Sequence, residues 1–383
     1  MAAPTERRVV VVGGGVMGCA VAYFLSLRGL KPTVVECTGV AHAASGKAGG
    51  FLARTWNDSI TIGPLTRASY ALHEKLAKDM DGARAYQWRP LHTVGVQVKV
   101  ASRRAAGAGV AGRPHGGVPF LDGEGITGKS VDVMGTPADT AQVHPRLFTE
   151  CLLREAEVRG ATSRTGTVVS VEREADALKS VTLADGTVLP ADVVVFCLGP
   201  WSNKVNAWLP ESPAVFGGTR AHSIVMRSKT ASPPVFEHAV FMDARFAGRH
   251  HHPEIYPRPD GTVYSCGFSD TRTPVPDDPA DVPLDPTICD KVEATVTATS
   301  ATIASGFTRE TSQSCFLPTS ADDLPVIGAL PGVGGAFMCT AHSCWGILLS
   351  PASGKALADL IVDGVTELVD LSPFRVERFV GGL

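Results

Sequence analysis

The chain has 383 residues, and at roughly 150 residues per domain this length predicts about two domains with room for a cleft between them. The composition, 44% hydrophobic and 19% charged, is typical of a compact α/β protein and excludes a fibrous or largely disordered chain. A net charge of −3 without a basic run argues against nucleic-acid binding, so small molecules are the expected partners. Because no apolar run reaches the length of a membrane span and the 9 cysteines form no CxxC pair or zinc-type cluster, we expect a cytoplasmic protein with reduced thiols.

The N-terminal region predicts a strand, a tight turn and a helix. Residues 8–12 form a β-branched run typical of a strand buried on both faces of a parallel sheet. Apolar residues recur at helical spacing over 16–28, and Gly29 follows where a helix C-cap belongs. Residues 32–36 predict a second parallel strand that ends in Glu36.

The later elements follow from the same patterns. Residues 101–140 are rich in Gly, Ala and charges and are expected to be loops, as is the Pro-rich segment 274–286. Periodicity predicts helices over 145–160 and 346–362. The second helix tolerates Pro351 because this residue falls in its first turns. Strands are predicted at 167–172, 180–183, 191–198 and 336–340 and near 221–227, 236–242, 254–257 and 262–268.

The first turn carries the sequence Gly13-Gly14-Gly15-Val16-Met17-Gly18, a G-x-G-x-x-G between a strand and a helix. In a dinucleotide site Gly13 makes the turn, Gly15 lets a pyrophosphate approach the helix N–H groups, and Gly18 allows close packing. Glu36 would accept hydrogen bonds from ribose hydroxyls and disfavours NADP. On this motif alone NAD and FAD stay open, as does a plain glycine-rich turn.

A second small-residue loop follows, Ser45-Gly46-Lys47-Ala48-Gly49-Gly50. A nicotinamide-binding fold does not need this loop, whereas an extended FAD could thread past it. An ordinary surface loop is the alternative interpretation.

Together these motifs resemble the D-amino-acid oxidase, glycine oxidase and sarcosine oxidase superfamily of FAD-dependent oxidoreductases. Similar motifs stand at Val168-Val169, at Cys197-Leu-Gly199-Pro-Trp201-Ser, at Tyr256–Tyr264, at Pro318–Gly328 and at His342–Leu348. The resemblance implies that FAD is held by Gly13, Gly15, Val16, Met17, Gly18, Glu36, Cys37, Ser45, Gly46, Lys47, Ala48, Gly49, Gly50, Val168, Cys197, Gly199, Trp201, Trp345, Gly346, Ile347 and Leu348.

The C-terminal motif also has a physical interpretation. A helix that begins near Gly346 presents unpaired N–H donors and a partial positive charge, and a reduced flavin is negative at its N1–C2=O edge. Aiming one at the other eases hydride acceptance. A helix start packed by Trp345 for core reasons is the alternative.

Cys315 stands where the sarcosine-oxidase branch has the residue that tethers its flavin, with Asp322 seven residues later. A thiolate near an electron-poor ring is competent for that bond. Simple packing of a buried thiol is the other interpretation.

Two departures from the family concern substrate and oxygen. Leu317 stands where glycine-oxidase-like members clamp the substrate carboxylate with an arginine, so Arg258, Arg220 or Arg54 would have to replace it, unless each is a surface or structural arginine. Ser265 stands near the position of a lysine that the sarcosine-oxidase branch uses for oxygen. Fast reaction with oxygen is therefore in doubt.

Histidines offer two more candidates. His342 precedes the flavin-facing helix and could orient substrate or flavin. The run His250-His251-His252 could line the mouth of a cleft, although an exposed loop explains it as well.

We therefore expect an α/β fold with a doubly wound, Rossmann-like FAD-binding lobe (1–60, 141–215 and 306–383) and a mostly antiparallel substrate lobe (61–140 and 216–305). The expected function is hydride transfer from a small amine or N-alkyl amino acid to FAD, giving an imine, with Arg258, His342 and Cys315 as catalytic candidates and oxygen or another acceptor for the electrons. The alternatives are a flavin dehydrogenase with a non-oxygen acceptor and a flavin-binding partner protein.

Overall fold

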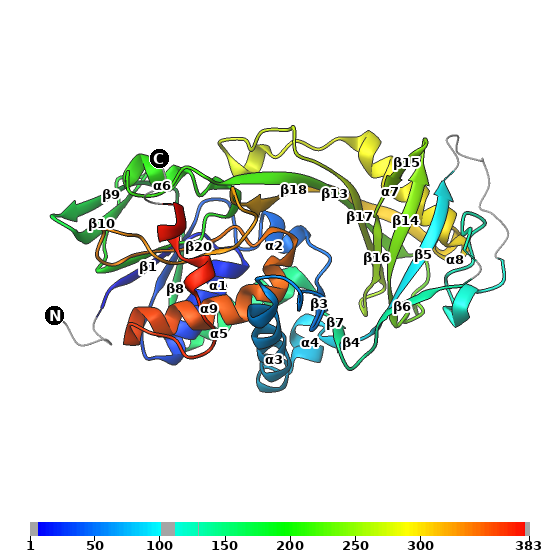
Figure 1. The fold of residues 1–383 in the computed structure, drawn as a ribbon, viewed down its shortest axis with the longest axis horizontal. Coiled ribbons are helices and arrows are strands. Elements are labelled where there is room, and N and C mark those ends of the chain that lie inside the picture. Colours follow the sequence, from blue (N-terminus) through cyan, green and yellow to red (C-terminus); the bar gives the residue numbers. More distant parts are fainter. Residues whose placement is uncertain (1–6, 101–111, 129, 380–383) are drawn as a thin grey trace.

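The computed structural model describes residues 7–100, 112–128 and 130–379. A six-stranded sheet with its helices occupies one half of the molecule and an eight-stranded sheet the other, and the long strands β13 and β18 run between them (Figure 1). The expected combination of a parallel sheet and a mostly antiparallel sheet is confirmed.

The six-stranded sheet is parallel except at one edge. Its strand order is β19-β20-β12-β1-β2-β8, and β19 alone pairs in the antiparallel sense. The all-valine strand β1 is buried on both faces, as its sequence predicts. The strands are β1 (Val9–Val12), β2 (Thr33–Glu36), β8 (Thr162–Thr165), β12 (Val193–Phe196), β19 (Val326–Ala329) and β20 (Ala336–Thr340).

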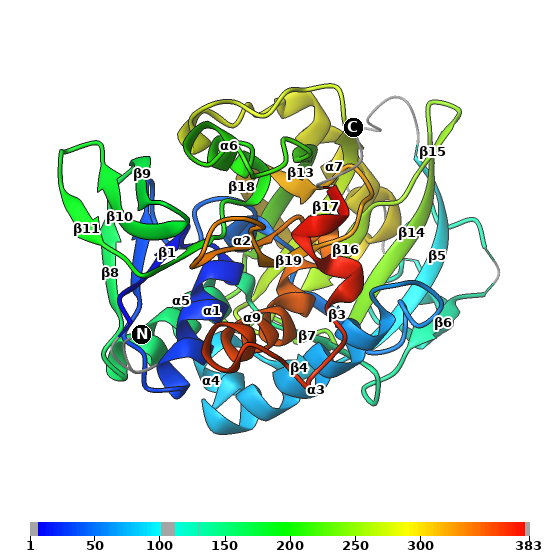
Figure 2. The ribbon, with the colours of Figure 1, turned by 60° about the vertical axis from the view of Figure 1, so that its left-hand side comes forward.

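Different elements cover the two faces of this sheet. Helices α1 (Val16–Leu27), α5 (Pro145–Val158) and α9 (Gly346–Asp363) pack on one face. On the other face lies an antiparallel sheet of β9 (Val168–Glu174), β10 (Ala177–Leu183) and β11 (Val188–Pro190), together with α6 (Lys204–Trp208). Figure 2 shows this three-stranded sheet at the left, beside β1 and β8.

The eight-stranded sheet has the order β18-β13-β17-β16-β14-β5-β6, with β15 paired to β14. Its pairs are antiparallel except β5 with β14. One face is covered by α7 (Pro286–Thr299) and α8 (Ala301–Gly306), and we call the opposite face, which carries Tyr256 and Tyr264, the front face. The strands are β5 (His92–Val100), β6 (Asp132–Gly135), β13 (Gly217–Ser228), β14 (His238–Phe246), β15 (Arg249–His251), β16 (Glu254–Pro257), β17 (Thr262–Asp270) and β18 (Phe307–Thr319).

A third group of elements lies between the two large sheets. It consists of the small sheet β3 (Phe51–Ala53), β7 (Thr140–Gln142) and β4 (Arg89–Pro90) with the helices α2 (Ala44–Lys47), α3 (Gly63–Asp79) and α4 (Gly82–Tyr86). Helix α3 packs against α9. The second glycine-rich loop leads directly into β3 and so joins the two halves.

The division of the chain into two discontinuous domains stays a prediction. Strand β18 pairs with β13 along its whole length, from Gly217 opposite Thr319 to Ser228 opposite Phe307. Residues 307–319, which we assigned to the FAD-binding lobe, therefore hydrogen-bond within the other sheet.

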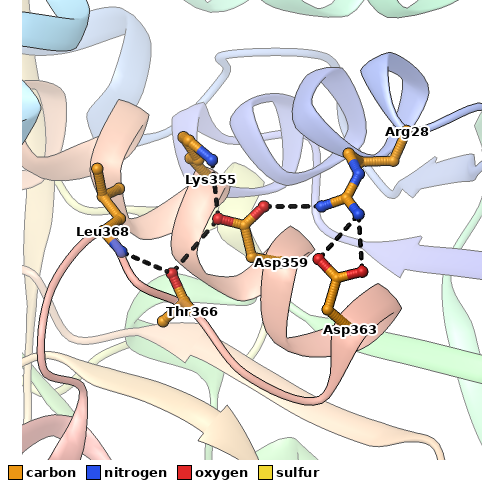
Figure 3. A network of polar contacts seen from close by, with 6 residues as sticks. All are labelled: Arg28, Lys355, Asp359, Asp363, Thr366 and Leu368. Carbon is orange, nitrogen blue, oxygen red and sulfur yellow. Dashed lines mark hydrogen bonds and ion pairs between the residues drawn. The ribbon is translucent and has the colours of Figure 1, made fainter.

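Ion pairs connect the C-terminal ends of α1 and α9. Arg28, which follows α1, lies 2.9 Å from Asp359 and 2.8 Å from Asp363 (Figure 3). Lys355 and Thr366 also bond to the Asp359 carboxylate. Within the described part of the chain, every helix is too short or too polar to cross a membrane.

Candidate active site

A cavity of about 600 Å³ runs from the turn after β1 to the start of α9. Segments that are far apart in the sequence enclose it at the carboxyl edge of the six-stranded sheet, where ligands of open α/β sheets bind. Of the predicted cofactor residues, those that line it are Gly13, Gly15, Val16, Met17, Glu36, Cys37, Ser45, Ala48, Val168, Cys197, Gly199, Trp201, Gly346 and Ile347.

The turn at one end needs its glycines. Gly13 has φ +110°, and a Cβ there would lie 2.4 Å from the carbonyl oxygen of Cys197. A Cβ on Gly18 would lie 1.9 Å from the carbonyl oxygen of Gly13, so α1 packs directly against the turn. Any side chain at either position would push the backbone out of the place where a pyrophosphate can meet it.

Glu36 holds this turn from the neighbouring strand. Its carboxylate accepts hydrogen bonds from the backbone N–H of Gly14 at 2.7 Å and from the N–H and hydroxyl of Thr38 at 2.9 and 2.8 Å. The carboxylate also borders the cavity. The N–H of Gly39 and the thiol of Cys37 also approach it, at 3.4 and 3.5 Å. Its expected bond to a ribose hydroxyl stays a prediction.

The start of α1 provides a donor-rich end. No acidic residue of the helix stands in its first turn, and the Glu36 carboxylate binds the N–H of Gly14, just before the N-cap Gly15. The N–H of Val16 donates to the hydroxyl of Ser45 at 2.9 Å, which ties the second glycine-rich loop to the first. This end of the cavity therefore suits an anionic phosphate.

The start of α9 forms the other end. The segment before it includes Ala341 and Ser343, both with positive φ (62° and 49°), so the backbone turns sharply into the helix at Gly346. No acidic residue stands in the first turn of α9. Leu317 and Pro318 of β18 face the same part of the cavity.

The family described as FAD dependent oxidoreductase (DAO) matches residues 8–360 of the chain. The protein belongs to this FAD-dependent oxidoreductase family. A Schizosaccharomyces pombe protein with a provisional oxidoreductase name is 29% identical over 94% of this chain and 95% of its own length. Glycine oxidase of Pseudomonas aeruginosa is 25% identical over 96% and 98%. The crystal structure of glycine oxidase from Geobacillus kaustophilus has the same fold, with a TM-score of 0.77 at 22% identity over 98% of this chain and 99% of that one.

The cavity of this FAD-dependent oxidoreductase suits FAD by its shape and its donors. The starts of α1 and α9 both line it, and both lack acidic residues in their first turns. They lie close together, since a Cβ on Gly346 would be 3.9 Å from Met17 Cε, and the cavity continues past α1 to Glu36 at the end of β2 and Val168 at the start of β9. An FAD in this cavity would place its adenosine near Glu36 and Val168, its phosphates at Gly15 and its ring at Gly346. This assignment of residues to the cofactor is a proposal that rests on the cavity.

His342 is the one catalytic candidate that lines the cavity. Its Nε2 lies 2.9 Å from the hydroxyl of Ser353, and its side chain is buried. Burial lowers the pKa of His342 to about 3, against a smaller opposing effect of the Thr340 backbone. The imidazole is therefore neutral at physiological pH and can act as a hydrogen-bonding group but not as a cation.

Cys315 is buried and does not line the cavity. Burial raises its pKa to about 11, and the nearby Lys47 ammonium opposes the rise. Lys47 itself donates to the carbonyl of Ser314 at 3.1 Å. The thiol is thus protonated at neutral pH, which favours packing over a covalent bond to the flavin.

The three arginine candidates differ in their contacts. Arg220 and Arg54 are paired with Asp270 (3.2 Å) and Glu74 (2.8 Å), which suits structural roles. Arg258 is buried away from the cavity lining, donates to the carbonyl of Ala48 at 3.1 Å and stacks over the Tyr264 ring at 5.1 Å. Burial lowers its pKa, and among the described residues no carboxylate forms an ion pair with it.

The remaining predicted residues lie outside the cavity lining. Gly46, Gly49 and Gly50 close-pack the second loop, and Trp345 and Leu348 pack into the core beneath α9. His250 pairs with Asp243 at 2.8 Å on the exposed hairpin of β14 and β15, so the triple-histidine run is not at the site.

Sequence reasoning missed the loop that covers the cavity. Residues 277–280, in the Pro-rich segment that we set aside as a plain loop, line it together with Lys204 and Trp208. Trp201 Nε1 donates to Pro276 O at 2.6 Å, and Lys204 Nζ donates to Asp277 O at 2.7 Å. The spacing of Trp201, Lys204 and Trp208 at one and two helical turns was the available signal.

Proposed function

We propose that the protein oxidises a small amine or N-alkyl amino acid. The carbon next to the nitrogen loses a hydride, and the resulting imine hydrolyses to a carbonyl compound and ammonia or a smaller amine. FAD supplies the redox chemistry by accepting the hydride. The observation that carries the proposal is that the cavity ends at the start of α9, between Leu317 and the neutral His342.

The residues at this end bind, orient and exclude water. Gly346 and Ile347 at the start of α9 line the cavity, so the first N–H groups and the dipole of this helix would stabilise negative charge on a flavin bound there. Leu317 and Pro318 present apolar surface, which keeps water from the reacting carbon. His342, held by Ser353, offers a fixed neutral imidazole to a polar group of substrate or cofactor.

Leu317 cannot bind a substrate carboxylate as an arginine would at this position. This favours a substrate that is recognised by other groups. Arg258 has no carboxylate partner among the described residues, but its guanidinium already contacts Ala48 and Tyr264. One relative is named 4-methylaminobutanoate oxidase (formaldehyde-forming), and one protein of similar fold is named iminodiacetate oxidase. Both names describe secondary amines that also carry carboxylates, so they support an N-alkyl group on the substrate and leave its carboxylate open.

A dehydrogenase that passes electrons to a non-oxygen acceptor is the second candidate. The structure corrects one detail of the argument for it, because Ser265 pairs with Ile224 and Ile255 and faces α7 rather than the front face. The front-face residues of β17 are Tyr264 and Cys266, and neither is a cation. The absence of a lysine from this strand thus still favours slow reaction with oxygen.

We expect the protein in the cytoplasm.

An anaerobic screen tests the proposal. Holoprotein is mixed with primary amines, N-alkyl amines and amino acids while the visible absorption of the flavin is followed. We expect at least one amine to bleach it. If dithionite bleaches the flavin and none of the amines does, the amine oxidation is wrong and a flavin-binding partner protein is favoured. Readmission of air then separates oxidase from dehydrogenase by the speed at which the colour returns.

A further inference from the structure

Glu254 lies in the middle of the front face of the eight-stranded sheet. Its neighbours across the strands are Phe241 on β14 and Cys266 on β17, so these three side chains form one row. The next residue on the same face of β16 is Tyr256, whose hydroxyl donates to the Glu254 carboxylate at 2.5 Å. The thiol of Cys266 lies 3.4 Å from the same carboxylate oxygen.

Four aromatic rings gather beside this carboxylate. We call Phe51, Trp56, Phe241 and Tyr256 the aromatic cluster. Phe51 stacks on Tyr256 with ring centroids 5.8 Å apart, and Phe241 stands 5.0 Å from Phe51 and 4.9 Å from Trp56. Three of these aromatic residues are only partly buried, namely Phe51, Trp56 and Phe241, so part of their surface is accessible.

The Glu254 carboxylate has no cationic partner. Among the described residues its hydrogen-bond donors are a phenol and a thiol, and no lysine, arginine or histidine pairs with it. Burial raises its pKa, and those two donors only partly offset the rise. An anion held in this way without a countercharge is costly unless a cation joins it.

Glu254 keeps part of its surface exposed although burial raises its pKa. Ile255 and Tyr256 on the same strand are 0% and 3% exposed, whereas Glu254 is partly exposed. Its charge acts on Cys344, whose pKa is raised first by burial and further by Glu254. Cys344 lines the cavity at the start of α9, and Glu254 itself does not. The second glycine-rich loop joins the two places, because Ala48 lines the cavity and a Cβ on Gly49 would lie 2.4 Å from the Tyr256 ring.

We propose that Glu254 and the aromatic cluster form the specificity site for a cationic amine, in which the carboxylate pairs with the protonated nitrogen and the rings hold its alkyl groups. Aromatic faces attract ammonium groups, and the attraction is larger where water is excluded. This inference rests on the proposed function and narrows its substrate class to amines that need no carboxylate.

The same pairing prepares the amine for oxidation. Loss of a hydride from the neighbouring carbon requires the free amine, because its lone pair must form the new double bond. One N–H bond of the ammonium breaks and one O–H bond forms on Glu254, which then returns the proton to solvent. A carboxyl with a raised pKa is suited to hold that proton.

A binding experiment on the holoprotein tests the inference without turnover. Choline is a cation with no N–H proton to give, and 3,3-dimethylbutan-1-ol has the same shape with carbon in place of the nitrogen. Both are titrated anaerobically against wild type, Glu254→Gln and Glu310→Gln, with tryptophan fluorescence and flavin absorption as readouts. Glu310 lies on β18 of the same sheet and pairs with Arg227 at the surface, so it is a matched control for charge.

We expect choline to have the same dissociation constant for wild type and Glu310→Gln. Its dissociation constant for Glu254→Gln should be at least about thirty-fold higher, since removal of one partner of a desolvated charge pair costs that much. The alcohol should bind all three proteins within about two-fold of one another. If wild type binds choline and the alcohol equally, or binds neither, the inference is wrong, and this comparison holds even if Glu254→Gln does not fold. If amines bleach the flavin but the protein shows no preference for cations, this inference is wrong and the proposed function stands. If choline binds as expected but no amine is oxidised, only the proposed function is wrong.

Discussion

The Nε2 atom of His73 on α3 lies 3.0 Å from the carbonyl oxygen of Ile347 in the first turn of α9. That carbonyl has no helical partner, because the residue four positions later is Pro351, which has no N–H. The N–H of Ala352 is likewise taken by the hydroxyl of Ser69, one turn before His73, at 3.0 Å. We expected Pro351 to be tolerated because of its position alone, but side chains of α3 complete the hydrogen bonding around it.

Replacing His73 by leucine should lower the free energy of unfolding by about 1–3 kcal/mol, since a buried carbonyl loses its main partner. The hydroxyl of Ser350, 3.0 Å from the same oxygen, limits the loss. Thermal unfolding of wild type and His73→Leu measures it. In a Pro351→Ala background, where the backbone can donate to Ile347, the same replacement should cost less; an equal cost in both backgrounds would mean that the bond to Ile347 does not matter.

The free energy of unfolding should already fall when the pH is lowered below about 6.5. Burial lowers the pKa of His73 to about 4 and that of His342 to about 3, against about 6.5 in the unfolded chain. Between pH about 6.5 and about 4 the unfolded chain binds protons that the folded chain does not, so the free energy of unfolding falls as the pH is lowered, by up to about 1.4 kcal/mol per pH unit for each histidine.

Urea unfolding at a series of pH values between about 7.5 and 5 measures this slope. His73→Leu should show a shallower slope than wild type, because one of the histidines with a lowered pKa is gone; the others, such as His144 with a pKa of about 4, still contribute. A wild-type free energy of unfolding that does not change over this range would contradict the buried, neutral state of both rings.

FAD should leave the protein on acid precipitation. The thiol of Cys315 is protonated at neutral pH and its side chain does not border the cavity, so a bond to the flavin is not expected. Yellow colour should therefore appear in the supernatant. Colour that stays in the pellet of wild type but not of Cys315→Ala would instead establish a covalent tether.

Glu36→Gln should weaken both the fold and FAD binding. A glutamine amide cannot accept hydrogen bonds at both ends, so either Gly14 or Thr38 loses its acceptor, at about 1–3 kcal/mol. Glu174→Gln, which changes an exposed carboxylate on β9 that pairs with Lys179, is the control. The melting temperatures of the apoproteins and the release of FAD fluorescence on dilution measure the two effects, and identical values for both variants would refute the role of Glu36 as a clamp.

Much of the FAD lobe could be predicted because local rules determine it. The valine run of β1, the glycine turn and the acid at the end of β2 each have one structural explanation, and all three are confirmed in the structure. Strands β13, β14, β16 and β17 were also found near their expected places.

The rest depends on contacts that the sequence does not reveal. We assigned no helix to residues 286–299 or 63–79, because α7 and α3 bury short stripes against sheets whose position only the fold supplies. Cys315 is a candidate by family resemblance, Arg258 as a possible carboxylate donor and His342 by its place before the last helix, and the structure brings only His342 to the cavity. Glu254 escaped notice because its significance depends on strands β14 and β17 beside it.

One extended FAD should occupy the cavity that is lined by the starts of α1 and α9. Equilibrium titration of the apoprotein with FAD, FMN and NAD tests it most directly, with flavin or tryptophan fluorescence as the readout. We predict one FAD per chain and much weaker binding of FMN and NAD, because FMN lacks the adenosine that would reach Glu36 and Val168 and NAD lacks the flavin ring at Gly346. Binding of FMN as tight as that of FAD, or a protein that takes up no flavin at all, would contradict the account.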